Sequence, residues 1–259
     1  MLEKLQLKIT RIGLIGFGKT GKAVANVILQ CKEFRLEWVL RQRNLLEKRS
    51  VPEFLGIESD HPGLIYSTSN TELETLINKH PVDIIIDFSS ENGIYTYFDI
   101  ARDRGIKIIS AVSHYEEKER KMLSILAKSN VVFWSPNITL GVNYLLFAAK
   151  FLKKIAPWVD IQISEEHFKE KKGISGTAIK IAEALDLEKS DINSVRAGGI
   201  VGKHEIIFGF PYQTVRLIHE SISREAFGNG VLFVAENLIN KPIGLYNFED
   251  LLIPYFASK

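Results

Sequence analysis

Short apolar runs and amphipathic segments alternate through the first half of the chain. The apolar runs are rich in β-branched residues, and they predict strands at Ile9–Ile15, Leu36–Leu40, Val82–Phe88, Ile106–Ala111 and Val131–Trp134. Segments of helical character lie between them, at Lys19–Cys31, Thr71–Asn78, Glu91–Arg104 and Tyr115–Lys128. Strands that are apolar along their whole length are typical of a parallel sheet with helices on both faces. The alternation therefore predicts a doubly wound α/β domain.

The pattern changes after Trp134. Strand-like and helical segments no longer alternate one by one, and Gly or Pro separates several of the strand-like runs. The predicted elements are a helix at Leu140–Ala156, a strand at Val159–Glu166, a helix that begins near Ser175, strands around Val195–Val201, His204–Phe210 and Thr214–Ser221, a helix at Arg224–Asn240, and a short tail at Leu245–Phe256. This order predicts a second, α+β domain with a mixed or antiparallel sheet.

Composition and charge exclude several classes of protein. The chain has 259 residues, of which 46% are hydrophobic and 25% charged, as in an ordinary globular protein. A net charge of +2 predicts no binding to nucleic acid or membrane. The single cysteine, Cys31, excludes an internal disulfide, and the scattered histidines lack metal-ligand spacing, so we expect no metal. No secretory segment and no apolar run near the ~20 residues of a membrane span occurs, so we expect a cytoplasmic protein.

The segment Gly13–Gly21 matches two phosphate-binding motifs. Gly13–Thr20 fits G-x-x-x-x-G-K-T, the loop of nucleotide triphosphatases, and Gly16–Gly21 fits G-x-G-x-x-G, the turn of dinucleotide-binding domains. A triphosphatase loop needs several loop residues to wrap the phosphates, whereas Leu14 and Ile15 continue the apolar strand. The dinucleotide interpretation is therefore favoured. Its candidate cofactor-binding residues are Gly16, Phe17, Gly18, Lys19, Thr20 and Gly21.

Two arginines at the end of the second predicted strand indicate which dinucleotide binds. About twenty residues after the glycines, an NAD-binding domain usually carries Asp or Glu for the ribose 2′-hydroxyl. This chain instead has Arg41 and Arg43, whose guanidinium groups can pair with a 2′-phosphate. The alternative is that both are solvated surface arginines. We predict NADPH as the cofactor, with NADH as the alternative.

A second candidate site lies where the later helix begins. Ser175, Gly176 and Thr177 offer two hydroxyls and the unpaired N–H groups of a helix start, and a basic run with Lys171 precedes them. Such an arrangement suits a carboxylate. The alternative is a simple helix cap beside a solvated basic loop.

Several segments together resemble the 4-hydroxy-tetrahydrodipicolinate reductases, also called dihydrodipicolinate reductases. They occur in the order of that family and extend over nearly the whole chain. The segments are the glycine turn, Asp87–Ser89, Ser135–Asn143, Glu165–Ala178, Arg196–His204, His219–Phe227 and Gly244–Leu251. The resemblance implies an NAD(P)H-dependent reductase of the lysine and diaminopimelate pathway, which transfers hydride to a cyclic unsaturated dicarboxylate.

The resemblance also implies an architecture and a set of site residues. It implies a Rossmann-like dinucleotide-binding domain made of residues 1–134 and 228–259, a substrate-binding and oligomerisation domain at 135–227, and a homotetramer. It places catalysis at His167 and Lys171, substrate binding at Ser175, Gly176 and Thr177, and the nicotinamide near Phe88, Ser110 and Ser113. His204 and His219 are interpreted as sheet residues of the second domain.

The chain departs from the family pattern around the expected catalytic residues. Phe168 stands where the second of two adjacent histidines is expected. One residue is missing before Ser175, and the segment Ser110–Ser113 replaces Gly-Thr-Thr-Gly. We favour an alignment with a one-residue deletion, which keeps Lys171, over a rigid one, which puts Glu170 at the lysine position. Two alternative functions remain: a divergent paralogue that reduces another cyclic imine or imino acid, and a non-catalytic NADPH-binding protein.

Overall fold

The computed structural model describes residues 9–257, and its contacts divide the chain into two compact units. The first unit runs up to Ile138 and includes Phe227–Leu251. The second comprises Thr139–Ala226 together with the residues from Leu252 on. None of the helices in this described part of the chain is long and apolar enough to cross a membrane.

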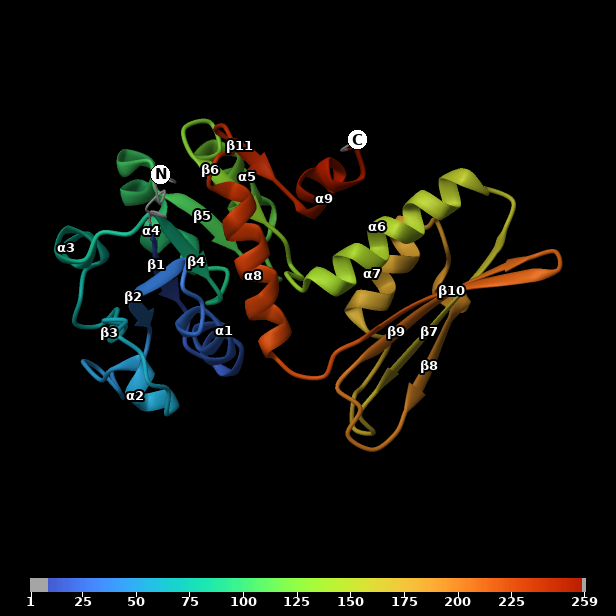
Figure 1. Cartoon of the computed structure of the whole chain (residues 1–259), viewed down its shortest axis with the longest axis horizontal. Coiled ribbons are helices and arrows are strands. Elements are labelled where there is room, and N and C mark those ends of the chain that lie inside the picture. Colours follow the sequence, from blue (N-terminus) through green and yellow to red (C-terminus); the bar gives the residue numbers. More distant parts are fainter. Residues whose placement is uncertain (1–8, 258–259) are drawn as a thin grey trace, which may run out of the picture. The chain divides into compact units, whose positions relative to one another are not determined.

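A seven-stranded parallel sheet forms the centre of the first unit (Figure 1). Its order is β11-β6-β5-β4-β1-β2-β3, and every neighbouring pair is parallel. The strands are β1 (Thr10–Ile15), β2 (Phe34–Arg41), β3 (Leu64–Ser67), β4 (Ile84–Asp87), β5 (Lys107–Ser110), β6 (Val131–Trp134) and β11 (Gly244–Tyr246). The sheet grows in one direction from β1 and in the other from β4. Ligands of such sheets bind at the carboxyl ends of the strands where the direction changes.

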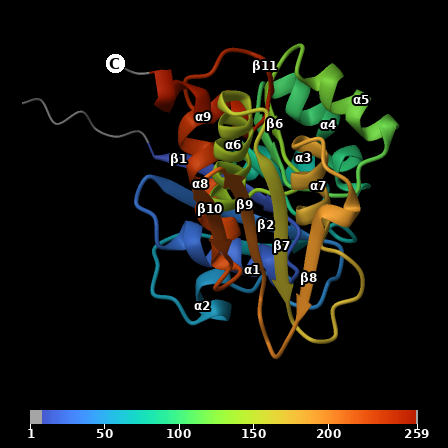
Figure 2. The ribbon, with the colours of Figure 1, turned by 90° about the vertical axis from the view of Figure 1, so that its right-hand side faces the viewer.

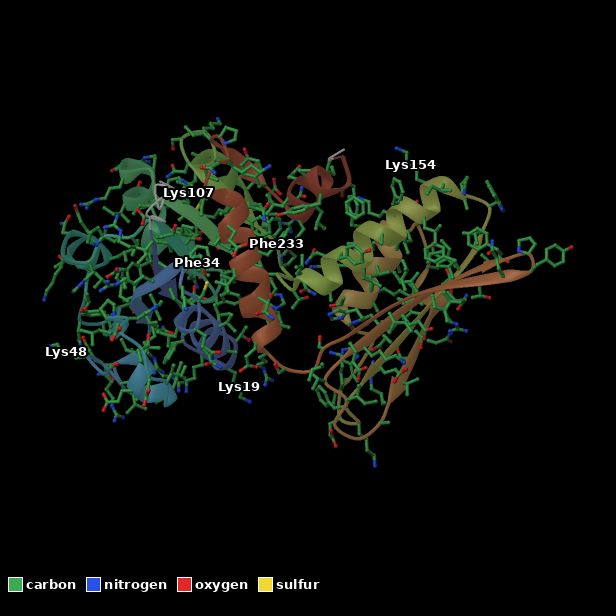
Figure 3. The ribbon with its side chains drawn as sticks, viewed as in Figure 1. Lys19, Phe34, Lys48, Lys107, Lys154 and Phe233 are labelled. Atoms are coloured by element: carbon green, nitrogen blue, oxygen red, sulfur yellow. The ribbon has the colours of Figure 1, made fainter. Side chains whose placement is uncertain are left out.

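Helices cover both faces of this sheet, as Figures 1 and 3 show. On one face α3, α4 and α5 share an apolar core with the sheet that includes the fully buried Trp38 and Tyr97. On the other face Phe133 of β6 contacts Phe248 of α9, which in turn stacks on Phe233 of α8. The helices are α1 (Lys19–Leu29), α2 (Val51–Leu55), α3 (Leu73–Lys79), α4 (Gly93–Arg104), α5 (Glu117–Leu126), α8 (Glu225–Leu238) and α9 (Phe248–Ala257). The predicted doubly wound parallel sheet is confirmed.

The second unit is built on a mixed sheet of four strands, which Figure 2 shows side by side. The order is β10-β9-β7-β8, in which β7 and β8 are parallel and the other pairs antiparallel. The strands are β7 (Asp160–His167), β8 (Ile192–Arg196), β9 (Lys203–Phe210) and β10 (Gln213–Glu220). Helices α6 (Leu140–Ile155) and α7 (Gly176–Ala184) share one core with this sheet, and a short 3₁₀ helix, η1 (Lys189–Asp191), precedes β8. The predicted α+β class of the second domain is confirmed, and its sheet is mixed.

Three local expectations need correction. The hydrophobic pattern predicts neither α2 nor β3, because five- and four-residue elements are too short to show a period. The strand expected at Val195–Val201 lies earlier, as β8, since Gly198 has a φ of +48° and the strand ends before it. The expected tail at Leu245–Phe256 contains the strand β11 and the helix α9.

Candidate nucleotide and substrate sites

The turn between β1 and α1 packs closely against the end of β4. Gly16 has a φ of +95°, and a Cβ at this position would lie 2.5 Å from the carbonyl oxygen of Phe88. A Cβ at Gly21, in the first turn of α1, would lie 2.1 Å from the carbonyl oxygen of Gly16. Only glycine fits at either position, so these two residues fix the path of the turn.

Gly18 differs from Gly16 and Gly21 because no described residue restricts the space around it. It is the N-cap of α1, its backbone is extended, and a Cβ built on it would meet nothing within 4 Å. No side chain caps the start of α1. The start of α1 therefore lacks a side-chain cap from the described residues and has free space beside Gly18, as the binding of a pyrophosphate requires.

Gly13 has a structural role in the sheet. It lies in β1, where a Cβ would come within 2.2 Å of the Trp38 ring on β2. Leu14 and Ile15 are buried strand residues, with 0% and 4% of their surface exposed. Three residues of the supposed triphosphatase loop are thus part of the sheet, and too few remain to wrap a triphosphate.

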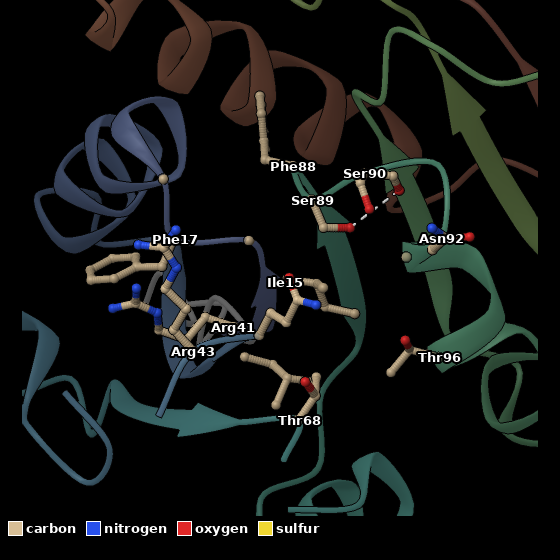
Figure 4. A pocket seen from close by; sticks show the side chains of 15 residues that line it. Ile15, Phe17, Arg41, Arg43, Thr68, Phe88, Ser89, Ser90, Asn92 and Thr96 are labelled. Carbon is tan, nitrogen blue, oxygen red and sulfur yellow. Dashed lines mark hydrogen bonds between the residues drawn. The ribbon is translucent and has the colours of Figure 1, made fainter. Parts of the chain in front are cut away.

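A pocket of about 620 Å³ opens beside this turn (Figure 4). Arg41, the last residue of β2, and Arg43 line it together with Gly16, Phe17 and Gly18. The residues that follow β4 and begin α4 line another side: Phe88, Ser89, Ser90, Asn92, Gly93 and Thr96. The remaining lining residues are Ile15, Leu40, Gln42 and Thr68. The N-cap of α1 and two arginines in one pocket fit an anionic dinucleotide with a further phosphate.

Lys19 and Thr20 begin α1 but are not among the residues that line this pocket, and Lys19 is exposed. A different lysine lies close to the turn. The ammonium of Lys22 is 4.7 Å from the centre of the Phe54 ring and 5.8 Å from that of Phe17. These contacts fix the position of the Phe17 ring at the edge of the pocket.

The predicted nicotinamide-end serines do not line this pocket. Ser110 is fully buried at the end of β5, where its hydroxyl donates a hydrogen bond to Tyr115 Oη at 3.0 Å. Ser113 is exposed in the loop that follows. Of the three residues assigned to the nicotinamide end, only Phe88 lines the pocket.

A buried carboxyl group supports the loop after β4. Asp87 Oδ1 accepts hydrogen bonds from the N–H and the hydroxyl of Ser89, at 2.8 and 2.5 Å, and Tyr115 donates to Oδ2 at 3.3 Å. Burial raises the pKa of Asp87. A Cβ at Gly93 would lie 2.1 Å from the Ser89 hydroxyl, so α4 begins directly against this cluster. Asp87 therefore connects the pocket loop to the sheet and to α4.

The second candidate site begins with a buried carboxylate on β7. Glu165 and His167 lie two residues apart and so share one face of the strand, next to Ser194 and Arg196 of the paired β8. Glu165 Oε1 accepts hydrogen bonds from Ser194 at 2.6 Å and from Arg196 Nη2 at 2.5 Å. Burial opposes the ionisation of Glu165, but the hydrogen bonds from Arg196, Ser194 and His167 outweigh it and hold its pKa at about 2.

The ionised Glu165 determines the tautomer of His167. Its Oε2 contacts His167 Nδ1, which must carry the hydrogen because a carboxylate can only accept. Burial lowers the pKa of His167, although the bond to Glu165 acts in the opposite direction. The ring is 7% exposed, and its neutral form presents a bare Nε2.

Arg196 also fixes the loop that carries Lys171. Its guanidinium donates hydrogen bonds to the carbonyl oxygens of Lys171, at 3.1 Å, and Gly173, at 2.6 Å. The Lys171 side chain is half-buried, and its positive charge lowers the pKa values of both His167 and His204. The two expected catalytic residues, His167 and Lys171, therefore interact electrostatically within the second unit.

The start of α7 completes this site. Ser175 is the N-cap, and its hydroxyl accepts hydrogen bonds from the N–H groups of Thr177, at 3.2 Å, and Ala178, at 3.5 Å. Its own N–H donates to Glu165 Oε1 at 3.4 Å. Gly176 is exposed, and a Cβ there would meet nothing within 4 Å. Ser175 therefore caps two of the first N–H groups of α7, as in the helix-cap alternative, and the exposed Gly176 leaves room for a ligand beside them.

His204 belongs to this site, although the sequence indicates only a sheet residue. It is indeed part of β9, as His219 is part of β10, but its Nε2 lies 3.0 Å from the Ser175 hydroxyl. Burial and then the neighbouring His167 and His219 lower its pKa to about 4. A signal in the sequence is its alternation with Ile206 and Phe208 on the buried face of β9.

Within residues 9–257, no group of three or more His, Cys, Asp and Glu side chains could hold a metal ion.

Comparison with known families finds matches over nearly the whole chain. The family profile described as dihydrodipicolinate reductase, N-terminus, matches residues 10–138, and the profile for the C-terminus matches residues 138–252. The chain belongs to the dihydrodipicolinate reductase family. The two matches meet at Ile138, where the first compact unit ends.

Individual members of the dihydrodipicolinate reductase family are similar over most of their length. The chain is 35% identical to the 4-hydroxy-tetrahydrodipicolinate reductase of Caldanaerobacter subterraneus subsp. tengcongensis over 257 residues, which cover 91% of this chain and 94% of the relative. It is 29% identical to that of Thermosipho africanus, over 93% of this chain and 97% of the relative. Among solved structures, a dipicolinate-bound dihydrodipicolinate reductase from Paenisporosarcina sp. TG-14 has the same fold. Its TM-score is 0.76 at 21% identity, and the match covers 93% of this chain and 98% of that one.

Proposed function

We propose that this member of the dihydrodipicolinate reductase family reduces 4-hydroxy-tetrahydrodipicolinate, the compound in the names of its relatives, with NADPH as the hydride donor. The observation that carries the proposal is the cluster on β7, β8 and α7. It combines a helix start capped by Ser175, a lysine and a histidine held by a buried carboxylate. Each of these groups suits an anionic, reducible substrate.

The choice of NADPH rests on the two arginines. Arg41 and Arg43 lie in the same pocket as Gly16, Phe17 and Gly18. Because the pyrophosphate of a dinucleotide binds at the start of α1, an adenosine ribose extends toward the end of β2 in domains of this type. Guanidinium groups there bind a 2′-phosphate by charge-assisted hydrogen bonds. When bound, NADPH supplies the hydride.

The substrate's carboxylates bind, in this proposal, at the N-terminus of α7. The N–H of the exposed residue Gly176 and the side chains of Ser175 and Thr177 supply hydrogen-bond donors, and the positive end of the helix favours an anion. The neighbouring Lys171 adds a full positive charge, which suits a dicarboxylate better than a neutral imine.

The proton that balances the hydride comes, in this proposal, from Lys171 Nζ. His167 is less suited, since burial lowers its pKa and keeps the ring neutral near pH 7. Its bare Nε2 accepts a hydrogen bond and so orients the bound substrate, while Glu165 fixes the ring. The 4-hydroxyl group of the substrate leaves as water, and the resulting conjugated dihydrodipicolinate gains one hydride and one proton. After donating, Lys171 recovers a proton from solvent.

Assembly and biological setting are part of the same proposal. The family resemblance supports a homotetramer and a place in lysine and diaminopimelate biosynthesis in the cytoplasm. Sedimentation of the purified chain tests the tetramer.

Oxidation of NADPH in the presence of freshly prepared 4-hydroxy-tetrahydrodipicolinate tests the proposed reaction. We expect steady oxidation that depends on the substrate. If NADPH binds but is oxidised only with another cyclic imine, the chain is a divergent paralogue. If it binds and no such compound is reduced, the chain is a non-catalytic NADPH-binding protein.

A further inference from the structure

The hydroxyl of Ser175 is bonded in all the directions that an alcohol offers. Its oxygen accepts from the N–H groups of Thr177, at 3.2 Å, and Ala178, at 3.5 Å. An alcohol oxygen has two lone pairs, so both are used and the third contact must involve its own hydrogen. That contact is with His204 Nε2, at 3.0 Å. In the free protein, therefore, Ser175 donates to a bare Nε2, and the hydrogen of the neutral ring is on Nδ1.

Nothing on the other side of the ring holds His204 in that tautomer. A histidine is normally fixed by the partner of its second nitrogen. His204 is only 4% exposed, and its Nδ1 is buried without a hydrogen-bond partner among the described residues. The position of the ring hydrogen in His204 is therefore determined by Ser175 alone.

The surroundings of His204 disfavour a charged ring. The His167 ring from β7 lies 5.3 Å away, and the His219 ring from β10 lies 6.5 Å away. Lys171 adds a positive charge, and Glu165 is the negative group that acts on His204. Burial lowers the pKa of His204 to about 4, so the ring stays neutral at the pH of most reactions. A change at His204 near neutral pH is thus a shift of its hydrogen between the two nitrogens.

We infer that His204 is a positioning residue that turns the Ser175 hydroxyl toward the substrate. An anion at the start of α7 takes the Ser175 hydrogen as a hydrogen bond. His204 then changes tautomer by proton exchange with water that enters during brief local openings of the site: Nδ1 loses one proton to that water, Nε2 gains one from it, and Nε2–H donates to the same Ser175 oxygen in place of the long bond from Ala178. The ring remains neutral, and no net proton is taken up. This inference rests on the substrate site proposed at Ser175.

Substitution of His204 by glutamine or by asparagine distinguishes a positioning role from simple packing, because both amides resemble histidine in shape. The amide of glutamine reaches the position of Nε2 and can accept or donate there, whereas the amide of asparagine reaches only the position of Nδ1. We expect His204→Gln to keep KM within about threefold of the unsubstituted chain. His204→Asn should raise KM at least tenfold with kcat changed less than threefold, and both variants should bind NADPH normally, because the NADPH pocket is lined by residues of the first unit.

A spectroscopic measurement on the unsubstituted chain covers the case in which a variant does not fold. In the ¹⁵N NMR spectrum of the histidine-labelled chain, His204 Nδ1 should be protonated without ligand. With saturating pyridine-2,6-dicarboxylate, Nε2 should be protonated instead. Equal KM values for the two variants would overturn the inference, and so would an unchanged tautomer of His204 in the ligand-bound chain. If the unsubstituted chain turns over normally in either case, the proposed function still holds. Absence of turnover by the unsubstituted chain would overturn both.

Discussion

Arg196 Nη2 lies 2.5 Å from Glu165 Oε1, and the carboxylate is completely buried. This pair joins β8 to β7, and through the carbonyl oxygens of Lys171 and Gly173 it also joins the sheet to the loop before α7. One guanidinium thus supports the histidine, the lysine and the helix start that form the proposed substrate site. Removal of the Arg196 guanidinium should therefore affect both the stability and the activity of the protein.

Arg196→Ala should lower the free energy of unfolding by about 3–5 kcal/mol, because it leaves the buried Glu165 without its compensating charge. The matched control is Arg216→Ala on β10. Arg216 pairs with Glu205 while its side chain is 54% exposed, so its loss should cost no more than about 1 kcal/mol. Urea unfolding measures both. Equal losses would show that the Glu165 pair does not hold the site together.

Two glycines of the β1–α1 turn should respond differently to alanine. Gly18→Ala should leave stability nearly unchanged, since its Cβ meets nothing, yet weaken NADPH binding at least tenfold by blocking approach to the helix start. Gly21→Ala should reduce both, since its Cβ would lie 2.1 Å from the carbonyl oxygen of Gly16. Thermal unfolding and NADPH titration separate the two effects. Normal NADPH affinity in Gly18→Ala would place the pyrophosphate elsewhere.

Replacement of Arg41 and Arg43 by alanine should weaken NADPH binding about 10- to 100-fold and leave NADH binding unchanged. Hydrogen bonds to charged groups contribute about 1.5–3 kcal/mol, which corresponds to this range. Arg49→Ala is the control, since Arg49 is exposed and does not line the pocket. An NADPH preference that survives the double substitution would contradict the assignment of the 2′-phosphate site.

The histidine on β9 should make stability depend on pH. The pKa of His204 in the folded chain is about 4, below its ordinary value of 6.5, so the unfolded chain binds the proton more readily. The stabilising contribution of neutral His204 to the free energy of unfolding is therefore complete above pH 6.5, and it is lost as the pH falls toward 4. Urea unfolding between pH 7.5 and 4.5 should show this loss, and His204→Gln should reduce the slope. Identical slopes would mean that His204 is not kept neutral by the fold.

Much of the first unit could be predicted because its strands and its glycine turn are each specified by a short stretch of sequence. The strands β1, β4, β5 and β6 are continuous apolar runs, and the glycine turn joins one of them to a helix. The adjacency of Arg41 to this turn also follows from general features of doubly wound sheets. By contrast, the burial of Ser110 depends on Asp87 and Tyr115, which belong to other elements.

The substrate site could be predicted only in part. Ser175 and Gly176 are visible in sequence as a helix start, whereas Arg196 and His204 reach them only through the pairing of β8 and β9 with β7. That register depends on the packing of α6 and α7 against the sheet, which no short motif specifies. A basic or aromatic residue on a strand gives no sign of which loop it will contact.

Adjacent lysines offer a sharp test of the proposed proton donor. Lys171→Ala should lower kcat at least 100-fold with NADPH binding unchanged, because the reduced substrate would lack its proton source. Lys172→Ala is the matched control, since Lys172 is exposed in the same loop and should retain nearly full activity. Equal rates for the two variants would remove Lys171 from the mechanism.

We propose above all that this chain transfers hydride from NADPH to 4-hydroxy-tetrahydrodipicolinate. The most direct measurement follows NADPH absorbance and product together, with substrate generated in the cuvette and the chain added last. We expect one NADPH to be consumed for each molecule of substrate reduced, at a rate proportional to the concentration of the chain. Bound NADPH that is never oxidised in the presence of this substrate would contradict it.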